Sequence, residues 1–195
     1  MIINKIEKKK IYLDVATLHM NTLETGFLPS LGIKFLTLMY KCIDESRFST
    51  LIVEYKDNQL QGFVTGFTGK SSLHKTLLYH PIELITILLP LMFNFKKILK
   101  ILNILKHMRR SNNKKLPKAE LLTICVNENF RRKGVAALLY KKLTDYFKSK
   151  SILEFVIVVG VSLEANAFYI KQGAAISGRV QIHSGSDSNI FIQKI

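Results

Sequence analysis

The stretch from residue 119 to residue 147 constrains the fold most, because it combines a buried strand, a basic turn and an amphipathic helix. Residues Leu121–Val126 are apolar or β-branched almost throughout, which predicts a strand in the interior of a sheet. Apolar residues then recur every four positions, as they do on one face of a helix: Val135, Leu139, Leu143 and Phe147. The stretch therefore predicts a strand–turn–helix unit.

The turn of this unit has the composition of an anion-binding site. A helix N-terminus offers backbone N–H groups that have no partner inside the helix, together with the positive end of the helix dipole. Gly134 and Ala136 are small enough to let the backbone approach a ligand, and Arg131, Arg132 and Lys133 add positive charge. The turn predicts a site for phosphate or pyrophosphate. The alternative is that these cations are a solvated charge cluster on a generic α/β domain.

The composition limits the class of protein. A chain of 195 residues fits one domain with a real core, so residues 1–195 are treated as a single domain. The net charge of +15 implies attraction to nucleic acid, an acidic membrane face or phosphorylated ligands, without choosing among them. Cys42 and Cys125 lie in apolar segments and are expected to be buried thiols in a reducing compartment, with neither disulfide nor metal. The N-terminal residues lack the apolar core of a signal peptide, so we expect a cytoplasmic protein.

The first part of the chain predicts two helices and a hairpin. The expected elements are a short strand at Ile2–Ile6, helices at residues 11–21 and 30–43, and strands at residues 51–53 and 60–67. Ser30 is expected to cap the second helix, and Gly62 and Gly66 within the last strand indicate a bulge or a close approach to the backbone.

A basic and apolar insertion follows, at about residues 73–117. The run Ile82–Phe95 is almost entirely apolar, but it is too short to span a bilayer and Pro90 divides it. Lysines then alternate with leucine and isoleucine, and no acidic residue occurs between Glu83 and Glu120. One interpretation is a helical insertion that packs on the core or covers the site. Others are an interfacial helix pair at residues 82–110 on an anionic membrane, or a dimer surface. Nucleic-acid binding is not expected, because aromatic residues are not interleaved with the basic ones.

The last part of the chain predicts alternating strands and one helix. The expected elements are a strand at Ile152–Val158, a helix from about Ala165 to Gly173, strands at about Ala175–Ile182 and Ile190–Gln193, and a loop at His183–Ser188.

This order of elements, apart from the insertion, resembles the GNAT superfamily of acyl-CoA-dependent N-acyltransferases. The family signature Gln/Arg-x-x-Gly-x-Gly/Ala is matched by Arg131, Gly134 and Ala136, directly after a buried strand. An Asn followed three residues later by Tyr, and then a Gly, is matched by Asn166, Tyr169 and Gly173. The segment GFLPSLGIKFLTLMY is similar to family members in bacterial sugar and polysaccharide pathways.

The resemblance implies an α/β fold with a mixed, mostly antiparallel sheet of about six to seven strands flanked by helices. The helical insertion would fall between strands three and four. It also implies acetyl-CoA as the acyl donor and a primary amine as the acceptor.

The resemblance also implies how the donor is held. Backbone N–H groups of Arg132–Ala136, with Val135 among them, would bind the pyrophosphate, and nearby cationic side chains would add charge. The backbone of Ile124–Val126, including Cys125, would pair with the pantetheine arm and polarise the thioester. Asn166 would hydrogen-bond the cofactor from the other side.

The catalytic groups are assigned by the same resemblance. Tyr169 is the candidate general acid, which would protonate the CoA thiolate; the alternative is a core tyrosine with its hydroxyl at the surface. Glu120 is the candidate general base, acting directly or through water, although a carboxylate at a strand end is usually solvated. His183 and Asp187 are alternative bases, and the amine could instead lose its proton to water.

The acceptor is expected to be a small-molecule amine, with an amino sugar or a nucleotide-linked amino sugar favoured because the positive charge would attract a diphosphate. Alternatives are acetylation of protein N-termini or lysines, and a non-catalytic module that binds acyl-CoA or a membrane. A homodimer and a position at the inner face of a membrane also stay open.

Overall fold

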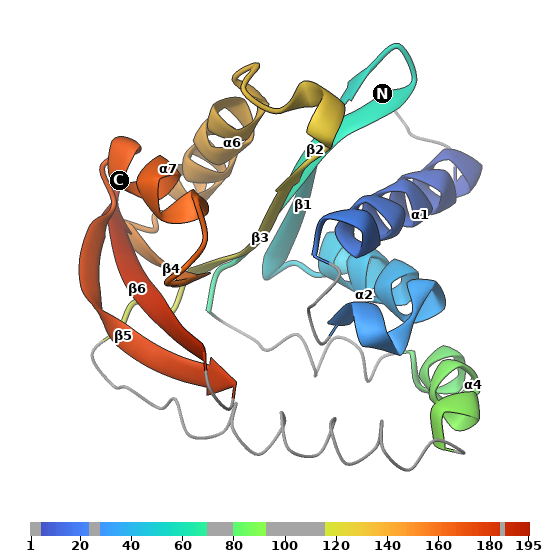
Figure 1. Ribbon diagram of the computed structural model, residues 1–195. Helices are drawn as coiled ribbons and strands as arrows, with labels where there is room; N and C mark the ends of the chain where they lie inside the picture. The colour runs from blue at the N-terminus through green and yellow to red at the C-terminus, as the bar shows by residue number, and fades with distance from the viewer. Residues whose placement is uncertain (1–4, 24–27, 70–79, 93–115, 184–185) are drawn as a thin grey trace.

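The computed structural model describes residues 5–23, 28–69, 80–92, 116–183 and 186–195 (Figure 1). Its helices are α1 (Lys5–Thr22), α2 (Ile33–Glu45), α4 (Pro81–Met92), α6 (Val135–Ser149) and α7 (Ala165–Lys171), with short 3-10 helices at Leu28–Leu31 and Glu128–Phe130. Its strands are β1 (Ser49–Lys56), β2 (Gln59–Phe67), β3 (Glu120–Val126), β4 (Glu154–Gly160), β5 (Ala175–His183) and β6 (Ser186–Lys194).

The strands in the described ranges form one six-stranded sheet in the order β1-β2-β3-β4-β6-β5. The pairs β1–β2, β2–β3, β4–β6 and β5–β6 are antiparallel, and β3–β4 is parallel. The expected mixed, mostly antiparallel α/β fold is therefore confirmed.

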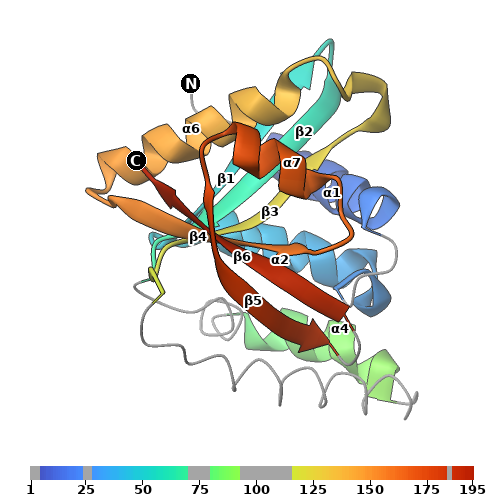
Figure 2. The same cartoon turned by 60° about the vertical axis from the view of Figure 1, so that its left-hand side comes forward.

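Helices cover both faces of this sheet, as the two views show (Figures 1 and 2). One apolar cluster lies between the sheet and α6 and α7, around Phe147, Phe155 and Phe191. We call the corresponding side of the sheet the α6 face. A second cluster lies between the sheet and α1 and α2, around Leu36, Tyr40 and Phe63. We call that side the α1/α2 face. Each of these six residues has an exposed fraction of 0%.

A bulge interrupts the pairing of β2 with β3 where Gly66 predicted one. The register shifts between Thr65 and Gly66, so Leu122 is the extra residue on β3. A Cβ atom on Gly66 would lie 2.4 Å from Cδ1 of Leu143 and 2.9 Å from Cζ of Phe147. Glycine at this position therefore lets α6 pack directly on the strand. Because Leu122 is an extra residue, the alternation of side chains between the two faces of the sheet shifts by one position after the bulge.

The prediction of a strand at Ile2–Ile6 is wrong for Lys5 and Ile6, which begin α1; residues 2–4 lie outside the described part. Burial explains the longer helix, because Val15 and Ala16 are fully buried against α2 and hold the helix on the core. The expected cap is also wrong. Ser30 lies in a 3-10 helix, and Gly32 occupies the N-cap of α2 without a side-chain hydrogen bond.

The insertion therefore falls between the second and third described strands, not between the third and fourth. Of the segment at about residues 73–117, the structure describes α4 and a few flanking residues. Leu84 and Ile87 pack against the α1/α2-face cluster, and Nζ of Lys41 lies 3.2 Å from Oε1 of Glu83. The other side of α4 is apolar and exposed: Ile82 by 76%, Ile85 by 61% and Leu89 by 52%. None of the helices in the described ranges is both long and apolar enough to cross a bilayer.

The expected loop at His183–Ser188 is shorter than predicted. Strand β6 begins at Ser186, and the ladder with β5 runs on to the pair His183↔Ser186. Backbone pairing along the hairpin extends both strands into a serine-rich stretch that carries no apolar strand pattern.

Candidate active site

The centre of the sheet opens between its two parallel strands. Strand β3 pairs with β2 from Glu120 to Val126, but with β4 only at Glu120↔Val156 and Leu121↔Ile157. Beyond Leu121 the two strands separate, and no described residue pairs with the edge of β3 that faces the opening. A free strand edge presents unpaired N–H and C=O groups that an extended ligand can pair with.

The bulge at Leu122 decides which amides face this opening. The backbone N–H of Asn127 donates to the carbonyl of Gln61 on β2, at 2.9 Å. Backbone direction alternates along a strand, so the amides of Ile124 and Val126 face away from β2, toward the opening. These are the two amides predicted to pair with the pantetheine arm.

Cys125 lies between Ile124 and Val126, and neither its amide nor its side chain faces the opening. It pairs with Phe63 on β2, and its buried thiol packs in the α1/α2-face cluster. Burial raises the pKa of the thiol to about 12, although nearby Arg131 opposes the shift. The structure thus places the thiol of Cys125 in the core, away from the backbone edge.

The basic turn has a backbone conformation suited to an anion. Gly134 is the N-cap of α6 at φ 82°, and Arg132 has the uncommon φ of 59°. No side chain caps α6, so the N–H groups of its first turn stay available. A Cβ atom on Gly134 would meet nothing within 4 Å, which means that the space above the helix start is open.

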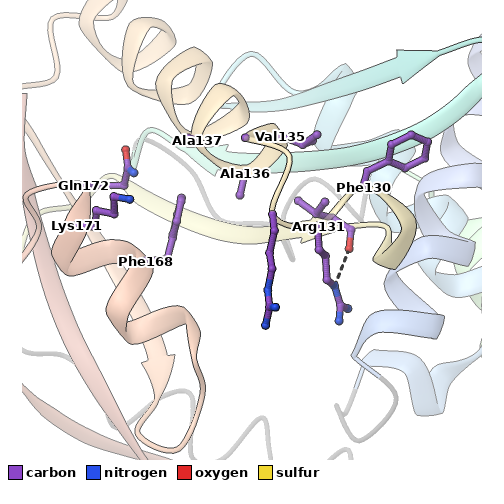
Figure 3. A pocket seen from close by; sticks show the side chains of 11 residues that line it. Phe130, Arg131, Val135, Ala136, Ala137, Phe168, Lys171 and Gln172 are labelled. Atoms are coloured by element: carbon purple, nitrogen blue, oxygen red, sulfur yellow. Dashed lines mark hydrogen bonds between the residues drawn. The ribbon is translucent and has the colours of Figure 1, made fainter.

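A pocket of about 350 Å³ lies at this helix start (Figure 3). Its lining comes from the end of β3, the turn, the first residues of α6 and one face of α7: Val126, Phe130, Arg131, Arg132, Gly134, Val135, Ala136, Ala137, Phe168, Lys171 and Gln172. Three of these residues are cationic and none is acidic. The volume is in the range of small-molecule sites. The residues present therefore fit a pyrophosphate-bearing ligand.

Two of the predicted cations lie at the pocket and one lies beside it. Arg131 and Arg132 both line the pocket. Nε of Arg131 donates to the carbonyl of Val126 at 3.4 Å (Figure 3). Lys133 is not among the lining residues. Its Nζ lies 5.6 Å from the centroid of the Phe130 ring, a cation–π contact.

The sequence analysis missed five lining residues: Phe130, Ala137, Phe168, Lys171 and Gln172. Lys171 and Gln172 are the two polar ones. They share a face of α7 with Phe168, at spacings of three and four residues. Helical periodicity counted from Phe168 would have found them, had the position of α7 opposite the start of α6 been known.

Comparison with known proteins identifies the family. Residues 18–174 match the profile of the family described as acetyltransferase (GNAT) family, which covers most of the chain. The chain belongs to the GNAT acetyltransferase family. It is accordingly an acetyl-CoA-dependent N-acetyltransferase, and acetyl-CoA is its acyl donor. No curated protein matches the chain in sequence.

Solved structures support the same fold. A crystal structure described only as an acetyltransferase has a TM-score of 0.61 at 17% identity and covers 95% of each chain. An aminoglycoside 6'-N-acetyltransferase complexed with coenzyme A has a TM-score of 0.59 at 10% identity, over 98% of this chain and 92% of the other. The PaiA N-acetyltransferase from Thermoplasma acidophilum, in complex with coenzyme A, has a TM-score of 0.58 at 16% identity, over 98% and 96%.

Tyr169, the family's candidate acid, lies on α7 with its ring buried and 3% exposed. The rings of Tyr140, Phe168 and Phe191 surround it at centroid distances of 6.0, 5.2 and 6.0 Å. Burial raises the pKa of its phenol, and the nearby Cys125 thiol adds to the shift. A raised pKa keeps this phenol protonated at neutral pH, which a general acid requires.

Asn166 lies one turn before Tyr169 on α7, and its side chain is hydrogen-bonded to other residues of the protein. Its Nδ2 donates to the carbonyls of Gly160, Val161 and Leu163 at 2.9, 3.2 and 2.6 Å. Its Oδ1 accepts from Nδ2 of Asn189 at 2.9 Å. An amide oxygen has two lone pairs, so one acceptor position remains for a cofactor. The side chain therefore holds the loop that leads into α7.

Glu120 begins β3, next to the point where β3 and β4 separate. Its neighbours Ala119 and Leu121 are buried in the α6-face cluster, so strand alternation directs the Glu120 carboxylate to the α1/α2 face. Burial raises the pKa of this carboxyl, and no partner cation for it occurs in the ranges the structure covers. A raised pKa suits a group that accepts a proton near neutral pH.

The two alternative bases differ in what the structure describes. Asp187 is exposed and pairs with Gln181 within the β5–β6 ladder, and its backbone carbonyl accepts from the N–H of Val161 at 3.0 Å. His183 ends β5, and its side chain lies outside the described residues.

Proposed function

We propose that the protein transfers the acetyl group of acetyl-CoA to the primary amine of a small, negatively charged molecule, with a nucleotide-linked amino sugar as the favoured acceptor. The observation that carries this proposal is the combination of a basic pocket at the start of α6 with the free edge of β3 beside it. The pocket supplies charge and N–H groups for a diphosphate, and the edge supplies amides for an extended chain.

The donor side of the site consists of the turn, α7 and the edge of β3. The N–H groups of Arg132–Ala136 bind the pyrophosphate, and Arg131, Arg132 and Lys171 add charge around it. The amides of Ile124 and Val126 hold the pantetheine arm in the opening. Acetyl-CoA supplies the activated thioester.

Two side chains move the protons. Glu120 takes a proton from the attacking amine, directly or through one water, since its carboxyl pKa is raised and no cation in the described part of the chain pairs with it. Tyr169 delivers a proton to the departing thiolate, since its phenol stays protonated at neutral pH. An amide on the free edge of β3 stabilises the negative charge that develops on the thioester oxygen.

The charge of the chain bears on the acceptor. A net charge of +15 repels polycations such as aminoglycosides or polyamines and attracts a sugar linked to a diphosphate. The aminoglycoside acetyltransferase among the similar structures indicates that an amino sugar is compatible with this fold. The likeness of residues 26–40 to sugar-pathway family members supports the same class.

The test is an acetyl-CoA-dependent thiol-release screen with five amines: UDP-glucosamine, glucosamine, spermidine, a peptide with a free N-terminus and a lysine peptide. The proposal expects the highest kcat/KM with UDP-glucosamine, and a preference over glucosamine that falls as salt screens the diphosphate. A peptide as the best acceptor would instead identify a protein acetyltransferase. Acetyl-CoA binding without thiol release from any amine would support a non-catalytic module and overturn the proposal.

A second part of the proposal concerns the insertion, which contacts an anionic membrane through residues 82–110. Support comes from the exposed apolar side of α4 and from the sequence, which has only basic charges between Glu83 and Glu120. The double variant Ile82→Ser/Ile85→Ser should lose flotation with phosphatidylglycerol vesicles, and Ile176→Ser, an exposed residue on β5, should keep it. A concentration-dependent dimer that the double variant abolishes would replace the membrane with a second copy of the chain.

A further inference from the structure

A series of side-chain hydrogen bonds joins β5 and β6 to α7. Nε of Arg179 on β5 donates to Oδ1 of Asn189 on β6 at 3.2 Å, and Nδ2 of Asn189 donates to Oδ1 of Asn166 on α7 at 2.9 Å. Nδ2 of Asn166 donates in turn to backbone carbonyls of the loop before α7, the nearest being that of Leu163 at 2.6 Å. We call Arg179, Asn189 and Asn166 the polar link. No step of the reaction proposed above uses Arg179 or Asn189.

The direction of donation along the polar link follows from its two ends. An arginine side chain can only donate hydrogen bonds, and a backbone carbonyl can only accept them. Oδ1 of Asn189 must therefore face Arg179, which leaves Nδ2 to donate to Asn166. If either amide were turned over, two donors or two acceptors would face each other. Both amides thus have one orientation, and the polar link fixes Asn166 relative to β6.

Asn189 is buried at a position where an apolar residue would fit. It is 7% exposed and lies opposite Val159 of β4, a member of the α6-face cluster. Directly opposed residues on antiparallel strands point to the same face, so the Asn189 side chain points to the face that α7 covers. A buried amide costs free energy unless it is hydrogen-bonded, so an amide at this position calls for a reason other than packing.

The polar link ends on the loop that borders the opening of the sheet. Beyond Ile157, β4 pairs only with β6 among the described strands, so the end of β4 lies beside the opening. Asn166 also donates to the carbonyls of Gly160 and Val161, at 2.9 and 3.2 Å. The loop that joins β4 to α7 is thereby tied to the first turn of the helix.

Helix α7 depends on such ties because it is short. It has seven residues, and a helix of that length is marginal without tertiary contacts. Its N-cap residue, Glu164, makes no side-chain cap hydrogen bond, so the side-chain bonds at this end come from Asn166. Tyr169 follows Asn166 by three positions, or about one turn. The place of the Tyr169 ring therefore depends on where the first turn of α7 is held.

We propose that Asn189 and Arg179 are positioning residues for Tyr169, and that they act through Asn166 to hold α7 where the Tyr169 hydroxyl reaches the departing thiolate. The inference rests on the proposed function, in which Tyr169 is the acid. Neither Asn189 nor Arg179 touches a substrate in this role. A misplacement of about 1 Å can cost on the order of 100-fold in rate. Asn189 contacts Asn166 directly, so its loss should cost more than the loss of Arg179.

The kinetic test measures kcat with acetyl-CoA and UDP-glucosamine, or with the amine from the screen that reacts fastest. Asn189→Leu, which is close in shape, should lower kcat about tenfold. The Kd for acetyl-CoA should stay within about threefold, since Asn189 does not line the donor pocket. The double variant Tyr169→Phe/Asn189→Leu should be no slower than Tyr169→Phe, because a positioning effect vanishes with the group that is positioned. Losses that multiply in the double variant would overturn the inference.

Gln193→Leu is the matched control for Asn189→Leu. Gln193 lies opposite Phe155, on the same strand and face as Asn189, but its amide is bonded to α6. Oε1 of Gln193 accepts from the hydroxyl of Tyr140 at 2.9 Å. The kcat of Gln193→Leu should therefore be unchanged. Equal losses of kcat in the two variants would overturn the inference, because an amide that does not reach α7 would then matter as much.

A conservative pair of variants tests the outer end of the polar link. Arg179→Met should lower kcat about threefold, since it removes one part-buried hydrogen bond. Arg179→Lys keeps a cationic donor and should keep most of the activity. Packing of the aliphatic stem alone would be served by methionine as well as by lysine. Equal kcat in the two variants would overturn the role assigned to Arg179.

A spectroscopic arm does not depend on the acceptor. The chain has seven tyrosines, and in fluorine-19 spectra of protein labelled with 3-fluorotyrosine the Tyr169 signal is the one that disappears in Tyr169→Phe. The inference expects Asn189→Leu to shift this signal and Gln193→Leu to leave it in place. Arg179→Met gives the same readout should Asn189→Leu fail to fold. An unmoved signal in both Asn189→Leu and Arg179→Met would overturn the inference.

The same spectra separate the inference from the proposed function. If the wild-type protein acetylates no amine, or if Tyr169→Phe keeps its kcat, the proposed function fails. The Tyr169 signal still reports whether the polar link positions the ring.

Discussion

The donor side and the acceptor side of the site are built in different ways. On the donor side, the backbone of consecutive residues, Arg131–Ala136, forms the start of α6. On the acceptor side, the packed side chains come from separate elements: His19 of α1 and Tyr40 of α2 are in contact although they lie 21 positions apart in the chain. A site that uses backbone groups leaves a local sequence motif, whereas a site that uses packed side chains leaves none. Substitutions can test this division, since each should affect one side and spare the other.

Tyr169→Phe should have the largest effect, because it removes the proposed acid between the two sides. We expect kcat to fall about 100-fold, within the range for loss of a general acid. The Kd for acetyl-CoA should stay within about twofold, because the ring and its packing are kept. Stopped-flow acetyl transfer and calorimetric binding measure the two quantities.

Tyr140→Phe is the matched control for that prediction. The Tyr140 ring lies 6.0 Å from the ring of Tyr169, and its hydroxyl bonds to Oε1 of Gln193 at 2.9 Å, away from the opening. It should lower the thermal midpoint and leave kcat nearly unchanged. Equal losses of kcat in both variants would show that packing, not proton transfer, is at stake.

Glu120→Gln should lower kcat/KM for the amine by at least about tenfold and leave the Kd for acetyl-CoA unchanged. In the wild-type protein, kcat/KM should rise with pH through the raised pKa of Glu120, because the base must be ionised. The variant should lack this rise of kcat/KM with pH. Glu154→Gln, at the exposed first residue of β4, is the control and should keep it. If kcat/KM of Glu120→Gln still rises with pH in the same way, the proton acceptor is water and not Glu120.

The same variant makes a prediction about stability. A carboxyl pKa that is raised in the folded chain means that folding favours the protonated form, so stability falls as pH rises above the unfolded value of 4.5. Glutamine stays neutral at every pH. The thermal midpoint of Glu120→Gln should therefore equal that of the wild type in acid and exceed it at about pH 8.

The fold and the donor side could be predicted from the sequence because their signals are local. The apolar run Leu121–Val126 and the glycine at position 134 gave the order strand, turn, helix, and the structure has that order. Gly66 indicated the bulge at Leu122, which turns the amides of Ile124 and Val126 toward the opening. These features depend on backbone geometry within a few residues.

What the sequence left out depends on contacts between distant segments. Lys171 reaches the pocket because α7 packs opposite the start of α6, and no local pattern reports that position. In the sequence, His19 is not distinguishable from other residues of its helix. Only the packing of α2 on α1 places Tyr40 in contact with it. The predicted first strand is wrong at Lys5 and Ile6 for the same reason, since burial of Val15 and Ala16 extends α1 through Lys5.

Lys171→Ala should weaken acetyl-CoA binding about threefold, the scale of an exposed charge contact, and the effect should shrink as salt is added. The KM for the amine should not change. Lys148→Ala, in the last turn of α6 and outside the pocket lining, is the control and should bind acetyl-CoA like the wild type. A larger effect on the amine than on acetyl-CoA would move Lys171 to the acceptor side.

Asn166→Ala should have the smallest effect on binding and a clear effect on stability. The variant removes the donors that bond to the carbonyls of Gly160, Val161 and Leu163 and frees Asn189, whose Oδ1 accepts from Nε of Arg179 at 3.2 Å. Loss of about 1–2 kcal/mol from these hydrogen bonds should lower the thermal midpoint by several degrees. One acceptor position of Oδ1 is available to the cofactor, so the Kd for acetyl-CoA should rise by no more than about threefold. A rise of tenfold or more at an unchanged midpoint would make Asn166 primarily a cofactor ligand and extend the donor side across α7.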